Sequence, residues 1–359
     1  MRSTIMEVDT KKLKYNIEQI KKYVGNKHVM PIVKANAYGT YINKRLETLN
    51  EFNIIAVAIV DEAIEIRKLG YNKNIFILNQ PAIEDISDIL EYNLTIGLSS
   101  VEFLEELEKI QNKIKVHIEI ETGMNRTGVQ IDKLQQYITK LKQNSNIIVE
   151  GVYTHLSSAD YDVDYTTQQL KKFKQAVEIV KREYKELKYI HSQASSGFLN
   201  YTDDVSNLVR TGIVMYGFEP FENVKGKIDI KPVCTLKSKI SFIKEIEEGE
   251  SVSYSRRYKA DKKRKIATIP IGYADGFRRE LTNIGEVVIN NKKAKVVGSV
   301  CMDSFMVDVT EIENIKVGTD VYIWDNDKIM LDEIAEKCNT INYEILTGIS
   351  YRVPRVFTK

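Results

Sequence analysis

The sequence predicts an α/β barrel of the TIM type, followed by a mostly β C-terminal domain. In the first two-thirds of the chain, short apolar runs alternate with amphipathic stretches, which is typical of repeated β-α units. Most runs are continuous and β-branched, as expected of strands buried on both faces. After about residue 228, Gly, Asn and Asp separate short strand-like segments instead. We therefore predict a barrel over residues 8–227, and a C-terminal domain over residues 228–359 together with residues 1–7.

The barrel prediction depends on eight apolar runs, which is the number of strands in a TIM barrel. The runs are residues 28–35, 54–60, 75–79, 94–98, 115–120, 148–156, 188–193 and 207–213. Between them, the spacing of apolar residues predicts helices over residues 41–52, 61–70, 82–93, 100–111, 132–143 and 166–187. Gly70 and Asn93 lie where two of these helices should end.

The C-terminal domain is predicted from short strands and turn residues. The strands are expected within residues 233–246, 251–255, 264–271, 285–300, 304–310 and 320–326. Asn290 and Asn291 interrupt the fourth of these segments and favour a tight hairpin. Two short helices are predicted near the end of the chain, over residues 331–338 and 342–349.

Composition narrows the class of protein. The 359 residues carry 52 Lys and Arg against 50 Asp and Glu, and the net charge of +2 argues against an electrostatic nucleic-acid binder. No apolar run is long enough to cross a membrane, and residues 1–12 lack the apolar core of a secretory signal. The three cysteines and four histidines show no metal-ligand spacing. We therefore expect a cytoplasmic, metal-free protein.

Polar side chains gather at the predicted carboxyl ends of the barrel strands, where TIM barrels place function. Lys34 follows the first run, Arg126 follows the fifth, and His155 ends the sixth. Ser195 follows the seventh run, and Arg210 lies within the eighth. Each residue alone has an ordinary structural explanation, but five on one rim predict a site.

The chemistry of this rim favours a pyridoxal phosphate site. Ile32 and Val33 precede Lys34, and desolvation lowers the pKa of an amine and frees it as a nucleophile. Small residues at 195–197 and 212–213 could hold a phosphate group with backbone amides. A reactive lysine and a phosphate cradle together are the features that pyridoxal phosphate requires.

Eight segments then resemble, in order and spacing, the motif series of alanine racemases. They are VKANAYG (33–39), ETGMNRTGV (121–129), THLSSAD (154–160), VRTGIVMYG (209–217), SVSYSR (251–256), IGYADGFRR (271–279), GSVCMDSFMVD (298–308) and SYRVPR (350–355). The resemblance implies a homodimer of a TIM barrel and a C-terminal β-domain that interconverts L- and D-alanine with pyridoxal 5′-phosphate.

The resemblance also implies a role for each matched residue. Lys34 carries the cofactor as an internal aldimine and is one base, and Tyr254 of the partner subunit is the other. Arg210 bonds the pyridine nitrogen, with His155 behind it. Arg126 contacts the phenolic side of the cofactor and the substrate carboxylate, Met302 and Asp303 line the substrate pocket, and Tyr273 belongs to the entry channel. The residues implied to hold the phosphate are Tyr38, Ser195, Gly212, Ile213 and Tyr351.

Physical chemistry agrees with a pair of bases. Racemisation removes a proton from one face of Cα and returns one to the other, so two groups on opposite faces are the simplest solution. A tyrosine with a pKa of about 10 is a poor base at neutral pH, and Arg256 and Arg257 are cations that could lower it. A guanidinium on the ring nitrogen would keep that nitrogen unprotonated, because it does not give up its proton.

Four positions depart from the family pattern. Thr40 and Tyr41 stand where the family usually has His-Gly, and Ala194 precedes Ser195 in place of asparagine. Glu119 stands where the family often has a lysine that takes up carbon dioxide as a carbamate. We hypothesise that the Glu119 carboxylate supplies the same negative charge and holds Arg126 in a bidentate pair.

The sequence leaves alternatives open. A serine or broad-specificity amino-acid racemase would use the same motifs. An amino-acid decarboxylase on the same barrel would need a glycine-rich phosphate loop and a cysteine opposite the lysine, and neither is evident. A non-catalytic pyridoxal-phosphate-binding protein would lack the second domain.

Overall fold

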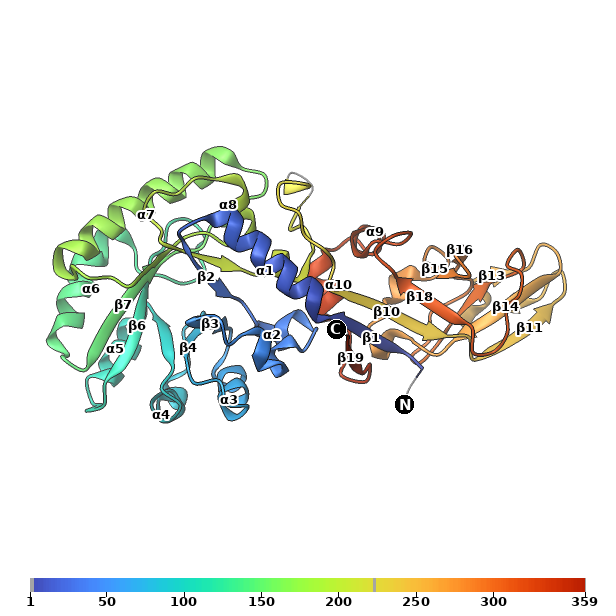
Figure 1. Ribbon diagram of the computed structural model, residues 1–359, viewed down its shortest axis with the longest axis horizontal. Helices are drawn as coiled ribbons and strands as arrows, with labels where there is room; N and C mark the ends of the chain where they lie inside the picture. Colours follow the sequence, from blue (N-terminus) through green and yellow to red (C-terminus); the bar gives the residue numbers. More distant parts are fainter. Residues whose placement is uncertain (1–2, 222–223, 359) are drawn as a thin grey trace. The chain divides into compact units, whose positions relative to one another are not determined.

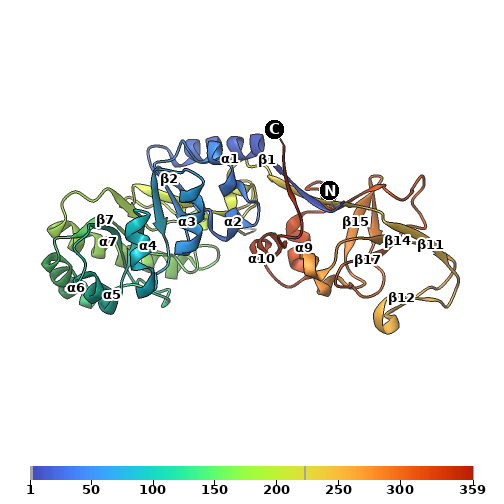
Figure 2. The ribbon, with the colours of Figure 1, turned by 90° about the horizontal axis from the view of Figure 1, so that it is seen from below.

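The computed structural model describes residues 3–221 and 224–358, which are drawn in two views in Figures 1 and 2. The chain divides into two compact units. The barrel unit consists of residues 14–37 and 41–231, and the C-terminal unit consists of residues 232–359 with residues 1–13 and 38–40. No helix of the described residues is long and apolar enough to span a membrane.

The barrel unit contains the predicted parallel strands, and all eight predictions are confirmed. They are β2 (His28–Pro31), β3 (Ile54–Val57), β4 (Asn74–Ile77), β5 (Thr95–Leu98), β6 (Ile114–Glu119), β7 (Ile147–Tyr153), β8 (Tyr189–His191) and β9 (Leu208–Thr211). Strands β3 to β8 form one parallel sheet, and β2 pairs with β9 in parallel. A bridge between Ile32 and Ala56 and a backbone bond from Asn207 N to Ile190 O join these sheets into a closed barrel.

Helices follow the strands on the outside of the barrel (Figure 1). The confirmed predictions are α3 (Val60–Lys68), α4 (Ile86–Glu91), α5 (Val101–Leu107), α6 (Ile131–Gln143) and α7 (Val163–Glu183). Gly70 and Asn93 have φ of 103° and 48°, the left-handed conformation expected just after a helix. The sequence prediction missed α1 (Thr10–Val24) and α8 (Ser195–Asn200).

The predicted helix over residues 41–52 is wrong. Two short 3-10 turns, Ile42–Lys44 and Leu46–Thr48, occupy the segment instead. Arg45 lies between them with φ −115° and ψ 74°, which is outside the helical region, so the turns cannot join. Tyr41 precedes the first turn with φ 60°, which also stops a right-handed helix from starting earlier.

The C-terminal unit is mostly β, as predicted. Its six-stranded sheet has the order β16-β15-β18-β10-β1-β19, and a three-stranded sheet has the order β11-β14-β17. The strands of these sheets are β1 (Ile5–Asp9), β10 (Cys234–Lys239), β11 (Phe242–Ile246), β14 (Arg264–Ile269), β15 (Glu286–Ile289), β16 (Lys292–Lys295), β17 (Phe305–Asp308), β18 (Asp320–Trp324) and β19 (Arg355–Thr358). Helices α9 (Leu331–Lys337) and α10 (Asn342–Thr347) follow the predictions.

Strand pairing in this unit joins both neighbouring and distant segments of the sequence. Asn290 and Asn291 have φ of 47° and 66° and join β15 to β16, which confirms the predicted hairpin. Strand β1, in contrast, lies between β10 and β19, which are more than two hundred residues away in the sequence. The start of the chain is therefore part of the C-terminal sheet.

Candidate active site

Lys34 lies just beyond β2, at the carboxyl edge of the barrel. It begins a single turn, α2 (Lys34–Tyr38), in which Ala35, Asn36 and Ala37 have left-handed φ and ψ near 50°. Burial lowers the pKa of the Lys34 ammonium, and the charges of Arg126 and Arg210 lower it further, against the opposing effect of Glu62. The amine is therefore more readily neutral than an exposed lysine, as the sequence analysis expected.

Arg210 is the most heavily bonded side chain of the barrel interior, and only 2% of its surface is exposed. Its Nη1 donates to His191 Nδ1 at 2.8 Å and to His191 O at 3.0 Å. Its Nη2 lies within bonding distance of Thr154 O (2.8 Å), Ser192 O (2.9 Å) and His155 Nδ1 (3.1 Å). These bonds use only Nη1 and Nη2, and within the described residues the Nε–H donates no hydrogen bond, so one donor of a firmly held guanidinium remains available.

The arginine also determines the tautomers of three histidines. Because a guanidinium only donates, His191 accepts at Nδ1 and carries its proton on Nε2, which donates to His117 Nδ1 at 2.9 Å. His155 accepts at Nδ1 in the same way, so its Nε2 carries a proton. Burial lowers the pKa of all three rings, and for His117 the pKa falls to about 3. The rings are thus neutral at physiological pH.

A short loop after β6 carries Arg126. The Glu121 carboxylate accepts from the N–H groups of Gly123 and Asn125, and Tyr165 Oη donates to Gly123 O at 2.6 Å. These three hydrogen bonds fix the backbone of the loop just before Arg126. The Arg126 side chain itself is exposed, in contrast to the buried Arg210.

Gln169, on α7, joins this loop to the end of β7. Its Nε2 donates to Thr122 Oγ1 and to His155 O, both at 3.2 Å. Its Oε1 accepts from Ser157 N at 3.0 Å and from Ser157 Oγ at 3.2 Å. The side chain is fully buried, so all four bonds replace water. The sequence analysis missed Gln169, although a glutamine on the same helix face as the buried Phe173 was a detectable signal.

The structure does not form the hypothesised pair between Glu119 and Arg126. Within the described residues, the buried Glu119 carboxyl forms no ion pair with Arg126, and the Tyr153 hydroxyl donates to Leu78 O at 2.9 Å. Burial raises the pKa of Glu119, while the nearby hydroxyl groups of Thr127 and Tyr153 and the charges of Arg126 and Arg210 oppose the rise. The hypothesised pair is not formed: the Glu119 side chain is buried, whereas the Arg126 side chain is exposed.

Ser195 and Gly212 lie on two neighbouring segments of the same barrel edge. Gly212 N donates to the buried Ser195 Oγ at 3.2 Å. Residues 195 and 213 are the first residues of helix α8 and of the 3-10 turn Ile213–Tyr216, and neither helical segment has a side-chain N-cap. Because β2 pairs with β9, this edge is also the edge beyond which Lys34 lies.

The remaining predicted site residues belong to the C-terminal unit. A pocket there is lined by Ser253, Tyr254, Cys301, Met302, Asp303, Ser304 and Met306. Tyr254 is 70% exposed and Met302 is 53% exposed. Tyr273 N bonds Cys301 O at 3.0 Å, which places the Tyr273 backbone beside this pocket. Tyr38 and Tyr351 also lie in this unit, where Tyr38 is buried and Tyr351 is 84% exposed.

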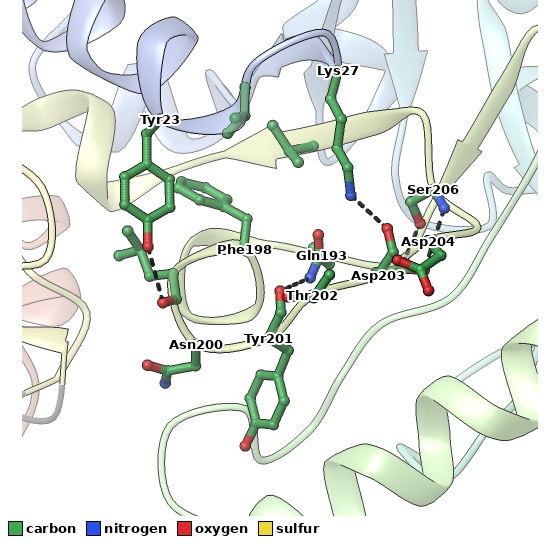
Figure 3. A pocket seen from close by; sticks show the side chains of 13 residues that line it. Tyr23, Lys27, Gln193, Phe198, Asn200, Tyr201, Thr202, Asp203, Asp204 and Ser206 are labelled. Atoms are coloured by element: carbon green, nitrogen blue, oxygen red, sulfur yellow. Dashed lines mark hydrogen bonds between the residues drawn. The ribbon is translucent and has the colours of Figure 1, made fainter.

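Another cavity of the barrel unit contains none of the predicted site residues (Figure 3). Its polar groups bond one another: Tyr23 Oη donates to Leu199 O at 3.3 Å, and Lys27 Nζ donates to Asp203 O at 2.7 Å. Gln193 Nε2 donates to Tyr201 O at 2.7 Å. A wall whose donors are used internally offers a ligand little to recognise.

Comparisons with known proteins identify the family. Residues 8–220 match the alanine racemase N-terminal domain, and residues 233–357 match the alanine racemase C-terminal domain. The alanine racemase of Halothermothrix orenii is 38% identical, over 99% of this chain and 97% of its own length. That of Methanococcus maripaludis is 36% identical, over 98% of this chain and 97% of its own length.

Solved structures give the same answer. The alanine racemase of Clostridium difficile is 33% identical and has a TM-score of 0.94, over 100% of this chain and 96% of its own. That of Bacillus anthracis is 31% identical and has a TM-score of 0.93, over 100% of this chain and 96% of its own. By sequence over both domains and by fold, this chain belongs to the alanine racemase family of isomerases.

Proposed function

We propose that this chain is an alanine racemase that interconverts L- and D-alanine, with pyridoxal 5′-phosphate held at the carboxyl edge of the barrel. The observation that carries the proposal is a lysine with a lowered pKa on the same edge as a buried arginine whose Nε–H, within the described residues, donates no hydrogen bond. We further propose that the working form is a homodimer with shared sites. A cytoplasmic location remains an expectation.

The residues of the barrel edge fit pyridoxal phosphate in three respects. Lys34 supplies an amine of lowered pKa for covalent attachment. Arg210 has a free Nε–H for the ring nitrogen, and its other N–H groups are fixed. The helical segments that begin at Ser195 and Ile213 lack a side-chain N-cap, so their first N–H groups suit a phosphate, with Gly212, Tyr38 and Tyr351 proposed as further contacts.

When bound, pyridoxal phosphate would delocalise the electron pair of the Cα–H bond, which makes that proton removable. Lys34 Nζ, as a neutral amine, would then take the proton from one face of Cα and become an ammonium. Tyr254 Oη of the partner subunit would give a proton to the other face and become a phenolate. In the opposite direction the two groups exchange these roles.

The other proposed residues bind and orient. Arg126 would attract the substrate carboxylate, and its exposure leaves the guanidinium accessible. The partner subunit's Met302 and Asp303 would line the substrate pocket, with Tyr273 at its entrance. His155 would hold Arg210 from behind, because its Nδ1 accepts an Nη2–H. Both Tyr254 and Met302 are largely exposed in the single chain, which supports their use by a second copy.

The direct test is to incubate the purified protein with L-alanine and to separate the products by chiral chromatography. D-Alanine should appear, and L-serine in a parallel reaction decides between a strict and a broad racemase. The Lys34→Ala protein should be slower by at least roughly a hundredfold, because one acid–base group is worth that much. Formation of D-serine with no D-alanine would contradict the proposed substrate.

Cofactor attachment has its own test. The wild-type protein should be yellow, and borohydride should bleach the colour and fix a covalent adduct on the peptide that contains Lys34. A Lys34→Ala protein that still forms a reducible adduct would show that another lysine carries the cofactor.

A further inference from the structure

The turn that begins at Lys34 is strained. Ala35, Asn36, Ala37 and Tyr38 are consecutive non-glycine residues with φ between 52° and 55°. A left-handed residue other than glycine costs about 1–2 kcal/mol, so such a run persists only where neighbouring groups hold it. Because Lys34 is the first residue of this turn, whatever holds the turn also holds the Lys34 backbone.

Glu62, on α3, accepts a hydrogen bond from this turn. Its Oε1 accepts from Ala35 N at 2.6 Å, and its Oε2 accepts from Ala58 N at 2.8 Å. Ala58 directly follows β3, the strand that meets the end of β2 through the bridge between Ile32 and Ala56. One carboxylate therefore joins the chain beyond two neighbouring strands by two charge-assisted hydrogen bonds.

Ordinary helix capping explains only half of this arrangement. Glu62 is the third residue of α3, where a glutamate often bonds the backbone just ahead of the helix, as Glu62 does at Ala58. The Ala35 bond crosses 27 residues of sequence to a different strand end, and helix capping gives no reason for it. The second bond ends one residue beyond Lys34.

The Glu62 charge also acts on the lysine. Arg126, on the loop after β6, and Arg210, on β9, both oppose the protonated form of Lys34, whereas Glu62, on α3, favours it. Glu62 thus supplies the negative charge that balances two arginines near Lys34.

We propose that Glu62 is a positioning residue for Lys34: its carboxylate ties Ala35 N to Ala58 N, keeps the left-handed turn in place, and so fixes the direction of the Lys34 side chain. The inference rests on the proposed function only where Lys34 is taken as a base. The tie itself is a property of the chain and can be tested separately.

Hydrogen exchange tests the tie in the intact protein. Glu62→Gln keeps the size of the side chain but leaves one good acceptor for two N–H groups. Peptides that contain Ala35 should exchange roughly 10- to 100-fold faster, which corresponds to the loss of a charge-assisted bond. Asp61→Asn, which removes the same charge from the exposed neighbouring residue, should leave these peptides unchanged. Unchanged exchange at Ala35 in Glu62→Gln would overturn the proposal.

Kinetics tests the consequence for Lys34. Glu62→Gln and Glu62→Asp should each lower kcat by roughly tenfold or more with KM within about twofold, because the turn loosens and the proposed substrate contacts remain. Glu62→Asp is informative because it keeps the charge and loses the reach, and it serves if Glu62→Gln does not fold. Faster exchange with unchanged kcat would overturn the positioning role. If the wild type racemises nothing, the proposed function fails while the exchange result still decides the tie.

Discussion

The two groups of proposed site residues lie in contrasting surroundings. Arg210, His117 and His191 of the barrel are buried, and within the described residues the hydrogen bonds of Arg210 leave only its Nε–H without an acceptor. Tyr254, Met302 and Tyr351 of the C-terminal unit are more than half exposed in the single chain. The hydrogen bonds of the barrel rim therefore hold its side chains in place within a single chain. The exposed side chains of the C-terminal unit, in contrast, contribute little to the stability of the fold.

This difference separates stability from activity. A buried polar network contributes to folding, because removing one member leaves the others without partners. An exposed tyrosine contributes almost nothing to the stability of the fold. A large loss of activity when it is replaced therefore indicates a role in function. Substitutions in the two regions should therefore have different signatures.

The largest effect is expected for Arg210→Met, which keeps a long side chain but leaves His191 Nδ1 and the buried carbonyl groups of Thr154 and Ser192 without their donor. We expect the free energy of unfolding to fall by roughly 4 kcal/mol, measured by urea denaturation, together with loss of activity. Arg257→Met, at an exposed position of the C-terminal unit, should change stability by less than about 0.5 kcal/mol. Equal stability of the two variants would contradict the proposed rigidity of the rim.

Tyr254→Phe should show the opposite signature. The hydroxyl is exposed in the single chain, so stability should change little, while kcat should fall by roughly 10²- to 10⁴-fold through loss of one acid–base group. Tyr161→Phe, at a similarly exposed tyrosine of the barrel unit, is the control and should leave kcat unchanged.

Hybrid subunits sharpen the same prediction. Inactive Lys34→Ala and Tyr254→Phe chains, unfolded and refolded together, should recover part of the activity, because one site of each hybrid dimer then receives both intact bases. Absence of recovery in verified hybrids would exclude shared sites.

The buried histidines predict how stability depends on pH. The folded-state pKa of His117 is about 3, below the ordinary value near 6.5, so between these values the unfolded chain binds the extra proton. Stability from this ring is therefore complete above about pH 6.5 and declines as the pH falls toward 3. Between pH 7 and pH 5 the loss should be about 2 kcal/mol for His117. His117→Asn should reduce the measured loss by that amount, and an unchanged slope would contradict a neutral buried ring.

A moderate effect on both stability and substrate binding is expected for Gln169→Leu, which removes four buried hydrogen bonds between the Arg126 loop and the end of β7. We expect a stability loss of about 1–3 kcal/mol and a several-fold higher KM, because Arg126 is proposed to bind the substrate carboxylate. Gln168→Leu, at the exposed neighbouring position, should change neither quantity. If kcat falls by a larger factor than KM rises, Gln169 acts on a part of the site other than the substrate carboxylate.

Much of the fold could be predicted because its signals are local. The eight barrel strands were found from continuous β-branched runs, and the Asn290–Asn291 hairpin from residues that accept positive φ. The helix over residues 41–52 was wrong because the conformation of Arg45 interrupts a segment whose apolar spacing is helical. Local spacing does not reveal such an interruption.

By itself, the sequence determined the barrel strands, the β-rich second domain and the motif residues that place the chain in its family, since these depend on short-range periodicity and residue type. The sequence analysis placed residues 1–7 in the C-terminal domain, but only the tertiary structure decided that β1 pairs with β10 and β19, that Glu119 forms no ion pair with Arg126, and that Glu62 reaches Ala35. The physical reason is that hydrogen-bond partners across the chain are selected by burial: a polar group removed from water must find a partner, and which partner lies within reach depends on the packed fold rather than on neighbouring residues.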